Sequence, residues 1–89
     1  MIIEIKRFGN ILSSRPEGRE AALILLANEL RNVNGKIELD FKDVLVMTPS
    51  WLSEFVNTLR PQIPTIHFLD SQNASVIGSI QIIRKMDQG

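Results

Sequence analysis

The segment "GKIELDFKDVLVMTPSWLSEFVNTL", residues 35–59, contains a strand, a turn and a helix that together decide the fold. Within it, apolar and acidic side chains alternate over residues 37–41, which predicts a strand buried on one face only. The apolar members of this strand are Ile37, Leu39 and Phe41. Glu38, Asp40 and the rest of the opposite face are expected to meet water, so helices should cover the sheet mainly on one side.

A helix is expected directly after this strand. Thr48 is the predicted N-cap, and Pro49 takes the first helical position, where its missing N–H costs nothing. A single apolar stripe then predicts that the helix docks by one face. The stripe consists of Trp51, Phe55 and Leu59, with Leu52 and Val56 beside them. Ser50 falls in the first turn, where the unpaired N–H groups and the helix dipole favour an anion.

Upstream, residues 1–8 alternate, and Gly9-Asn10 supplies turn chemistry before the short segment "ILS" at 11–13, which predicts a hairpin-like start. A first helix should follow, because Ser14 and Glu17 fit a capping box and Pro16 is tolerated in the first turn. The helical spacing predicts a stripe that packs against the core, and Asn34-Gly35 is expected to end the helix. The stripe contains Leu23, Leu26 or Ala27, and Leu30.

Downstream, residues 60–64 ("RPQIP") break the second helix, and residues 65–70 alternate as a further strand. A last helix is expected to begin at a cap supplied by Asp70 or Ser71. Its buried positions recur at helical spacing: Val76, Ile80 and Ile83. The alternation of periods along the chain predicts one α/β domain over residues 1–89, with about four strands in a mixed sheet and three helices mainly on one face.

The composition excludes several classes of function. Ten basic residues balance ten acidic ones in 89 residues, so no overall field draws the chain to nucleic acid or to an anionic membrane. The absence of cysteine and the single histidine exclude thiolate catalysis and zinc sites. Neither G-x-G-x-x-G nor a P-loop occurs, which argues against nucleotide binding, and no cofactor is expected. The charged N-terminus reads neither as a signal peptide nor as a membrane span, so a cytoplasmic protein is expected.

Two groups of residues carry a resemblance to a known family. In the quoted segment they are Asp40, Phe41, Val44, Thr48, Ser50, Trp51 and Glu54, and before it they are Gly9, Ser14 and Arg15. In this order and spacing they resemble bacterial STAS-like domains of unknown function, which are related to anti-sigma factor antagonists. The resemblance covers roughly residues 8–60, and the last third of the chain matches mostly by the order of its elements.

The resemblance implies a STAS-like fold and a non-enzymatic regulatory module that works by protein–protein interaction in signalling. The partner it implies is a regulatory protein, such as a histidine-kinase-like ATPase or an anti-sigma factor. The best-known members are phosphorylated on a serine that opens the helix after the central strand, within a "D-S-S-G" type sequence. This chain has "MTPSW" there, so Ser50 and Thr48 are the phosphorylation candidates. If Pro49 occupies the acceptor position, phosphorylation has been lost, and Thr48 simply caps the helix.

The candidates for partner binding gather around the two helix starts and the end of the central strand. They are Ser14, Arg15, Arg19, Asp40, Asp43, Trp51 and Glu54. An alternative interpretation places three arginines together near the start of the first helix, where they would bind a phosphate or an acidic partner: Arg7, Arg15 and Arg19.

Two other classes of function stay open. One is a phosphotransfer receiver that accepts phosphate on Asp40, because a strand ending in an acid is followed by a proline turn. The other is a small ligand-binding enzyme, for which no nucleophile, base and oxyanion set stands at a credible spacing. The sequence shows no further ligands that would complete a metal site at Asp40 and Asp43. It also shows no partner residue for His67 as a catalytic group. In the alternative without a functional role, Asp40 and His67 lie on the solvent-facing side of the sheet.

Overall fold

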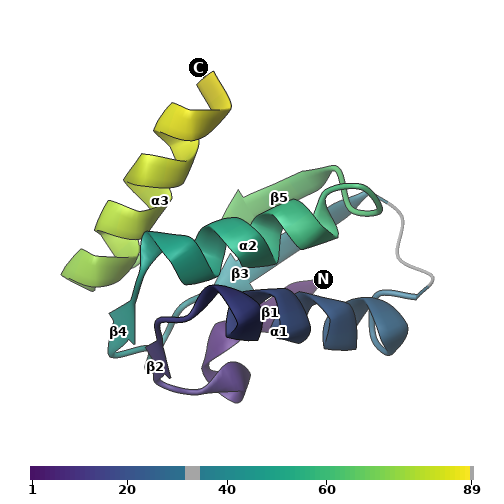
Figure 1. Cartoon of the computed structure of the whole chain (residues 1–89), viewed down its shortest axis with the longest axis horizontal. Coiled ribbons are helices and arrows are strands. Elements are labelled where there is room, and N and C mark those ends of the chain that lie inside the picture. The colour runs from purple at the N-terminus through teal and green to yellow at the C-terminus, as the bar shows by residue number, and fades with distance from the viewer. Residues whose placement is uncertain (32–34, 89) are drawn as a thin grey trace.

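The computed structural model describes residues 1–31 and 35–88 of the chain (Figure 1). In chain order the elements are β1 (Ile2–Glu4), the 3-10 helix η1 (Ile5–Phe8), β2 (Ile11–Leu12), α1 (Arg15–Ala27), β3 (Lys36–Asp40), β4 (Val46–Met47), α2 (Pro49–Leu59), β5 (Thr65–Phe68) and α3 (Ala74–Gln88). The predicted α/β class and its three helices are confirmed. Within the described ranges, no helix has both the length and the apolar character needed to cross a membrane.

The strands form two separate sheets, and every pairing in them is parallel. One sheet has three strands in the order β1-β3-β5, and the other pairs β2 with β4. The prediction of about four strands in one mixed sheet is therefore wrong. The physical reason is the connections: a helix lies between the two strands of every pair, and such a crossover returns the chain in the same direction.

The start of the chain is not the predicted hairpin. Residues 5–8 form η1, and Gly9 follows with a φ of +126°, which turns the chain out of the three-stranded sheet. β2 then meets β4, where the N–H groups of Leu45 and Val46 donate to the Asn10 oxygen at 2.8 and 3.0 Å. The two strands that were expected to pair with each other thus belong to different sheets.

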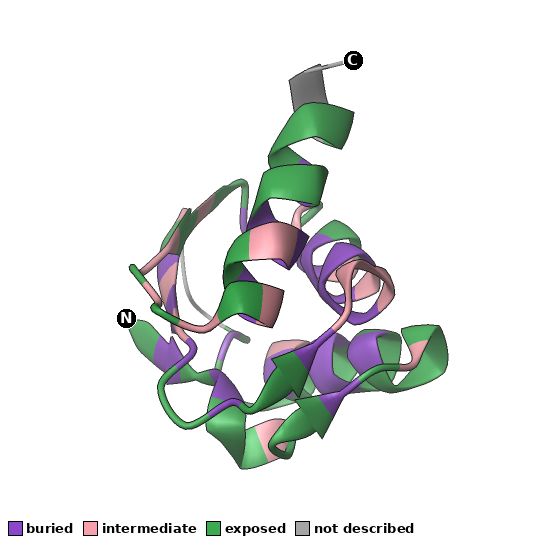
Figure 2. Cartoon of the chain, turned by 90° about the vertical axis from the view of Figure 1, so that its left-hand side faces the viewer, coloured by how far each residue is buried: buried purple, intermediate pink, exposed green. Residues whose placement is uncertain are grey.

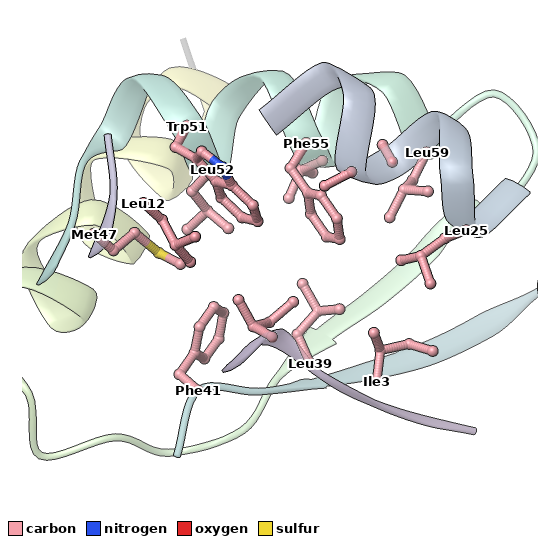
Figure 3. Close-up of a cluster of buried hydrophobic side chains, with 14 of the residues drawn as sticks. Ile3, Leu12, Leu25, Leu39, Phe41, Met47, Trp51, Leu52, Phe55 and Leu59 are labelled. Atoms are coloured by element: carbon pink, nitrogen blue, oxygen red, sulfur yellow. The ribbon is translucent and has the colours of Figure 1, made fainter. Parts of the chain in front are cut away.

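Helices α1 and α2 cover one face of the three-stranded sheet (Figures 1 and 3). On the central strand β3, Ile37 and Leu39 are buried beneath the helices, while Glu38 and Asp40 are half-buried on the opposite face. His67 on β5 is exposed. The predicted division of the sheet into a buried face and a wetter face is confirmed.

Helix α1 buries a face that overlaps the predicted one only in part: Leu26 is half-buried against the core, but Ala27 is exposed. Its buried residues are Gly18, Ala21, Ala22 and Leu25, whereas Leu23 is 46% exposed. Small side chains are needed there because α1 and α2 approach closely: a Cβ on Gly18 would lie 2.3 Å from the Trp51 oxygen. The helix also ends earlier than expected, at Ala27, and the predicted stop at Asn34 lies outside the described residues. Leu30 is buried, but beyond the helix end.

Helix α2 buries the stripe that the sequence predicts. Trp51 and Phe55 stack with ring centroids 4.9 Å apart, and Phe8 of η1 packs against both rings. Figure 3 shows Trp51, Leu52 and Phe55 directed toward Leu39 and the other apolar side chains of the sheet. This is the centre of the hydrophobic core.

Helix α3 begins at a cap that the sequence did not indicate. The cap is Asn73 rather than Asp70 or Ser71, and its Oδ1 accepts from the N–H groups of Ser75 at 2.9 Å and Val76 at 3.1 Å. The predicted buried positions Val76, Ile80 and Ile83 are confirmed. Figures 1 and 2 both show the C-terminal half of α3 projecting beyond the rest of the molecule.

Candidate functional site

The starts of α1 and α2 lie side by side, because the parallel strands β2 and β4 each lead directly into one of these helices (Figure 1). Two hydrogen bonds join the ends of the strands. The N–H of Thr48 donates to the Leu12 oxygen at 3.0 Å, and its hydroxyl donates to the Ser13 oxygen at 2.9 Å. The two-stranded sheet therefore fixes the relative position of the two helix starts.

Both helix starts are capped as the sequence predicts. The Ser14 Oγ accepts from the N–H of Glu17 at 3.2 Å, and the Thr48 Oγ1 accepts from the N–H of Trp51 at 3.3 Å. Because the Thr48 hydroxyl also donates to Ser13, it is occupied as donor and as acceptor. Its geometry is that of a structural cap that ties α2 to the strand before α1.

Ser50 differs from Thr48 in having a hydroxyl that makes no hydrogen bond within the part of the chain that the structure describes. The residue is half-buried in the first turn of α2. Glu54 follows one turn later on the same side of the helix. The Glu54 Oε2 lies 3.9 Å from the Nη1 of Arg15, so these two candidates are brought together across the two helices. Arg19 is exposed on α1.

An apolar patch adjoins the helix starts. Ile11 and Val46 are paired in register on the outer side of the two-stranded sheet, with 61% and 43% of each residue exposed, and neighbouring Leu45 is 60% exposed. We call these three residues the β2–β4 patch. Sequence reasoning missed it, although consecutive apolar residues at 44–46 were a signal, since a strand buried on one side must expose some of them.

Asp40 and Asp43 lie away from the helix starts, at the last residue of β3 and in the loop that follows it. The Asp40 Oδ1 accepts from the N–H of Lys42 at 3.0 Å, and the Asp43 carboxylate accepts from the Lys6 ammonium at 3.4 Å. This hydrogen bond, followed by the charge of Glu4, raises the pKa of Lys6. Asp40 and Asp43 line a hollow of about 400 Å³ together with Asp70. Among the described residues, no group of three acidic or histidine side chains could hold a metal ion.

Arg7 does not cluster with Arg15 and Arg19, so the expected binding site of three arginines is not formed. Its guanidinium makes a two-pronged ion pair with the carboxylate of Glu29, beyond the opposite end of α1. Hydrogen bonding from Arg7 lowers the pKa of Glu29, and the same bond raises the pKa of Arg7. The pair fastens η1 to the residues that follow α1.

Trp51 belongs to the core rather than to the surface. The residue is only 1% exposed, so in this structure its ring offers no contact area to a partner. Of the expected binding residues, those at the helix starts form one neighbourhood and those after β3 form another. The first contains Ser14, Arg15 and Glu54, together with both hydroxyl candidates.

Comparisons of the chain with protein-family models, with curated proteins and with solved structures find no significant match. The resemblance to STAS-like domains therefore rests on the residues named above and stays a prediction.

Proposed function

We propose that this chain is a regulatory docking module of the STAS-like type, which binds a partner protein through the β2–β4 patch and the adjoining starts of α1 and α2. The observation that carries the proposal is the patch itself: three neighbouring apolar residues are exposed on, or next to, the two strands that lead into α1 and α2. Clustered exposed apolar side chains rimmed by polar groups are typical of protein interaction sites.

The polar rim gives the surface a means of regulation. Ser50 lies four residues after Val46, and its hydroxyl makes no hydrogen bond among the described residues. Glu54 follows one helical turn later and faces Arg15 of α1. Phosphate on Ser50 would add about two negative charges at the rim while the dipole of α2 offsets their cost to the fold. The resemblance favours a regulatory partner such as a histidine-kinase-like ATPase or an anti-sigma factor.

Replacing Ile11 with lysine is expected to abolish partner capture from the native host. The charge would stand in the centre of the patch, where docking removes water, so at least a tenfold loss of affinity is expected, as is common for central interface positions. The matched control is Ile2→Lys, because Ile2 is 58% exposed but lies on the three-stranded sheet. Quantitative pull-down measures both. Equal retention of every partner by the two variants would remove the patch from the docking surface.

Phosphorylation by a cognate kinase is expected on Ser50 and not on Thr48. The Thr48 hydroxyl is engaged by Ser13 and Trp51, whereas no contact in the described chain must break to release that of Ser50. Incubation with the kinase and ATP, followed by fragmentation mass spectrometry, locates the phosphate. Phosphate on Thr48 would contradict the assignment, and an acid-labile phosphate on Asp40 would favour the receiver alternative instead.

A further inference from the structure

Strand β5 offers unpaired backbone groups at the edge of the three-stranded sheet. The N–H of Thr65 donates to the Gly35 oxygen at 2.9 Å, and that of Leu69 donates to the Leu39 oxygen at 3.0 Å. Because successive backbone groups of a strand point to opposite sides, Ile66 and Phe68 direct their N–H and C=O groups away from β3. No strand pairs with β5 on that side in the described chain.

The residues of this edge also lack the charges and prolines that often prevent pairing with another chain. Proteins blunt exposed edges with charged residues, proline or bulges within the strand. The four residues of β5 include no Asp, Glu, Lys, Arg or Pro. Ile66 and Phe68 are only half-buried, so an added strand would cover apolar surface as well as backbone.

A hollow of about 160 Å³ lies where α3 passes the carboxyl end of β5. Phe68 lines it from β5, and Ile77, Ile80 and Arg84 line it from α3. The α3 side continues as a second hollow along Ile82 and Lys85. Figures 1 and 2 show α3 extending past the edge of the sheet at this end, so a strand added to β5 would approach the helix.

Taken together, the two hollows are lined by one more cation than acid: Arg84 and Lys85 against Asp70. The guanidinium of Arg84 lies 5.9 Å from the centre of the Phe68 ring, and the residue is exposed. Neither Arg84 nor Lys85 forms an ion pair with any described residue, and Asp70 is the one acid among the residues that line the two hollows. A ligand with a carboxylate would complement these cations.

From this geometry we propose that the edge of β5 binds an extended segment of a partner protein by strand addition. The segment pairs with the outward groups of Ile66 and Phe68, places an apolar side chain in the hollow and directs a carboxylate to Arg84. A second copy of β5 complements the site less well, because Thr65–Phe68 supplies no carboxylate. The proposal does not depend on the β2–β4 patch, which lies on the other sheet.

The test uses the whole ¹⁵N-labelled chain and two probe peptides, acetyl-Glu-Val-Thr-Val-Thr-amide and acetyl-Thr-Val-Thr-Val-Glu-amide, which cover both strand directions. At least one probe should cause saturable shifts in the amide signals of residues 65–69 and of α3 residues 77–85. Replacing its Glu by Gln should weaken binding roughly fivefold, since a single solvent-accessible ion pair is lost.

Arg84→Gln should remove the preference for Glu over Gln while backbone pairing persists. Arg31→Gln is the matched control, because Arg31 is an exposed arginine outside β5 and α3. The proposal is overturned if neither probe shifts the β5 amides at millimolar concentration, or if Glu and Gln probes bind equally. Sedimentation measures self-association: a dimer that Ile66→Pro dissociates, by removing an outward N–H, would assign the edge to a second copy and would likewise overturn it.

Discussion

Replacing Gly18 with alanine is expected to cost about 3 kcal/mol or more of the free energy of unfolding, at or above the upper end of typical overpacking. The added Cβ would lie 2.3 Å from the Trp51 oxygen, 3.1 Å from its carbonyl carbon and 3.2 Å from its Cα. These are backbone atoms, so no flexible side chain can swing aside. Helices α1 and α2 would have to separate, which would open the core beneath Phe55.

Urea and thermal unfolding of Gly18→Ala measure this loss, with Gly78→Ala as the matched control. A Cβ on Gly78, within α3, would meet no atom within 4 Å. Alanine there should stabilise the protein by about 0.5–1 kcal/mol, because glycine loses more backbone entropy in a helix. The two variants make the same chemical change with opposite expected signs. A Gly18→Ala protein as stable as the unsubstituted one would show that α1 and α2 are not held at this distance.

The role of Gly18 illustrates what the sequence could not show. Helix starts were predicted correctly because their signals are local: Ser14 with Glu17, and Thr48 with Pro49, each lie within a few residues of one another. The buried face of α1 was predicted only in part, since residues 21–27 are apolar throughout and do not show which side of the helix faces the core. The close approach of α2 then determines which face of α1 is buried.

The sheets show the same division between local and distant information. Alternation along β3 and β5 predicted which of their faces is buried. It could not predict that all pairings are parallel, because pairing depends on where a crossover returns the chain. β2 and β4 have two residues each, too few to show any period. The exposed Ile11 and Val46 therefore became recognisable as a pair only in the structure.

For the candidate site, the sequence supplied the hydroxyls and the structure distinguished them. Thr48 and Ser50 were both foreseen at the start of α2, and only the contact to Ser13 shows how fully Thr48 is engaged. The ion pair of Arg7 with Glu29 was missed, since residues 22 positions apart share no local pattern. The sequence offers Glu29 several possible cationic partners, so the pairing with Arg7 can be identified only once the fold is known.

Replacing Asn73 with alanine is the second change expected to have a large effect, with a loss of about 2–3 kcal/mol. Its Oδ1 caps α3 through Ser75 and Val76, a contribution of about 1 kcal/mol. Its Nδ2 donates to the oxygens of Val44 at 3.0 Å and Leu45 at 2.9 Å, and each of these bonds adds roughly 1 kcal/mol. One side chain thus joins the start of α3 to the loop that carries part of the β2–β4 patch.

Two further variants separate these contributions. Asp70→Ala tests the cap expected from the sequence, and a loss below about 0.5 kcal/mol is predicted because Asp70 is exposed and does not cap α3. Asn73→Asp keeps the acceptor for Ser75 and Val76 but loses both donors, and it sets a carboxylate oxygen against two carbonyl oxygens. Its stability should therefore fall although its cap is retained. Chemical denaturation ranks the three variants, and a larger loss for Asp70→Ala than for Asn73→Ala would contradict this account of how α3 is joined to the patch.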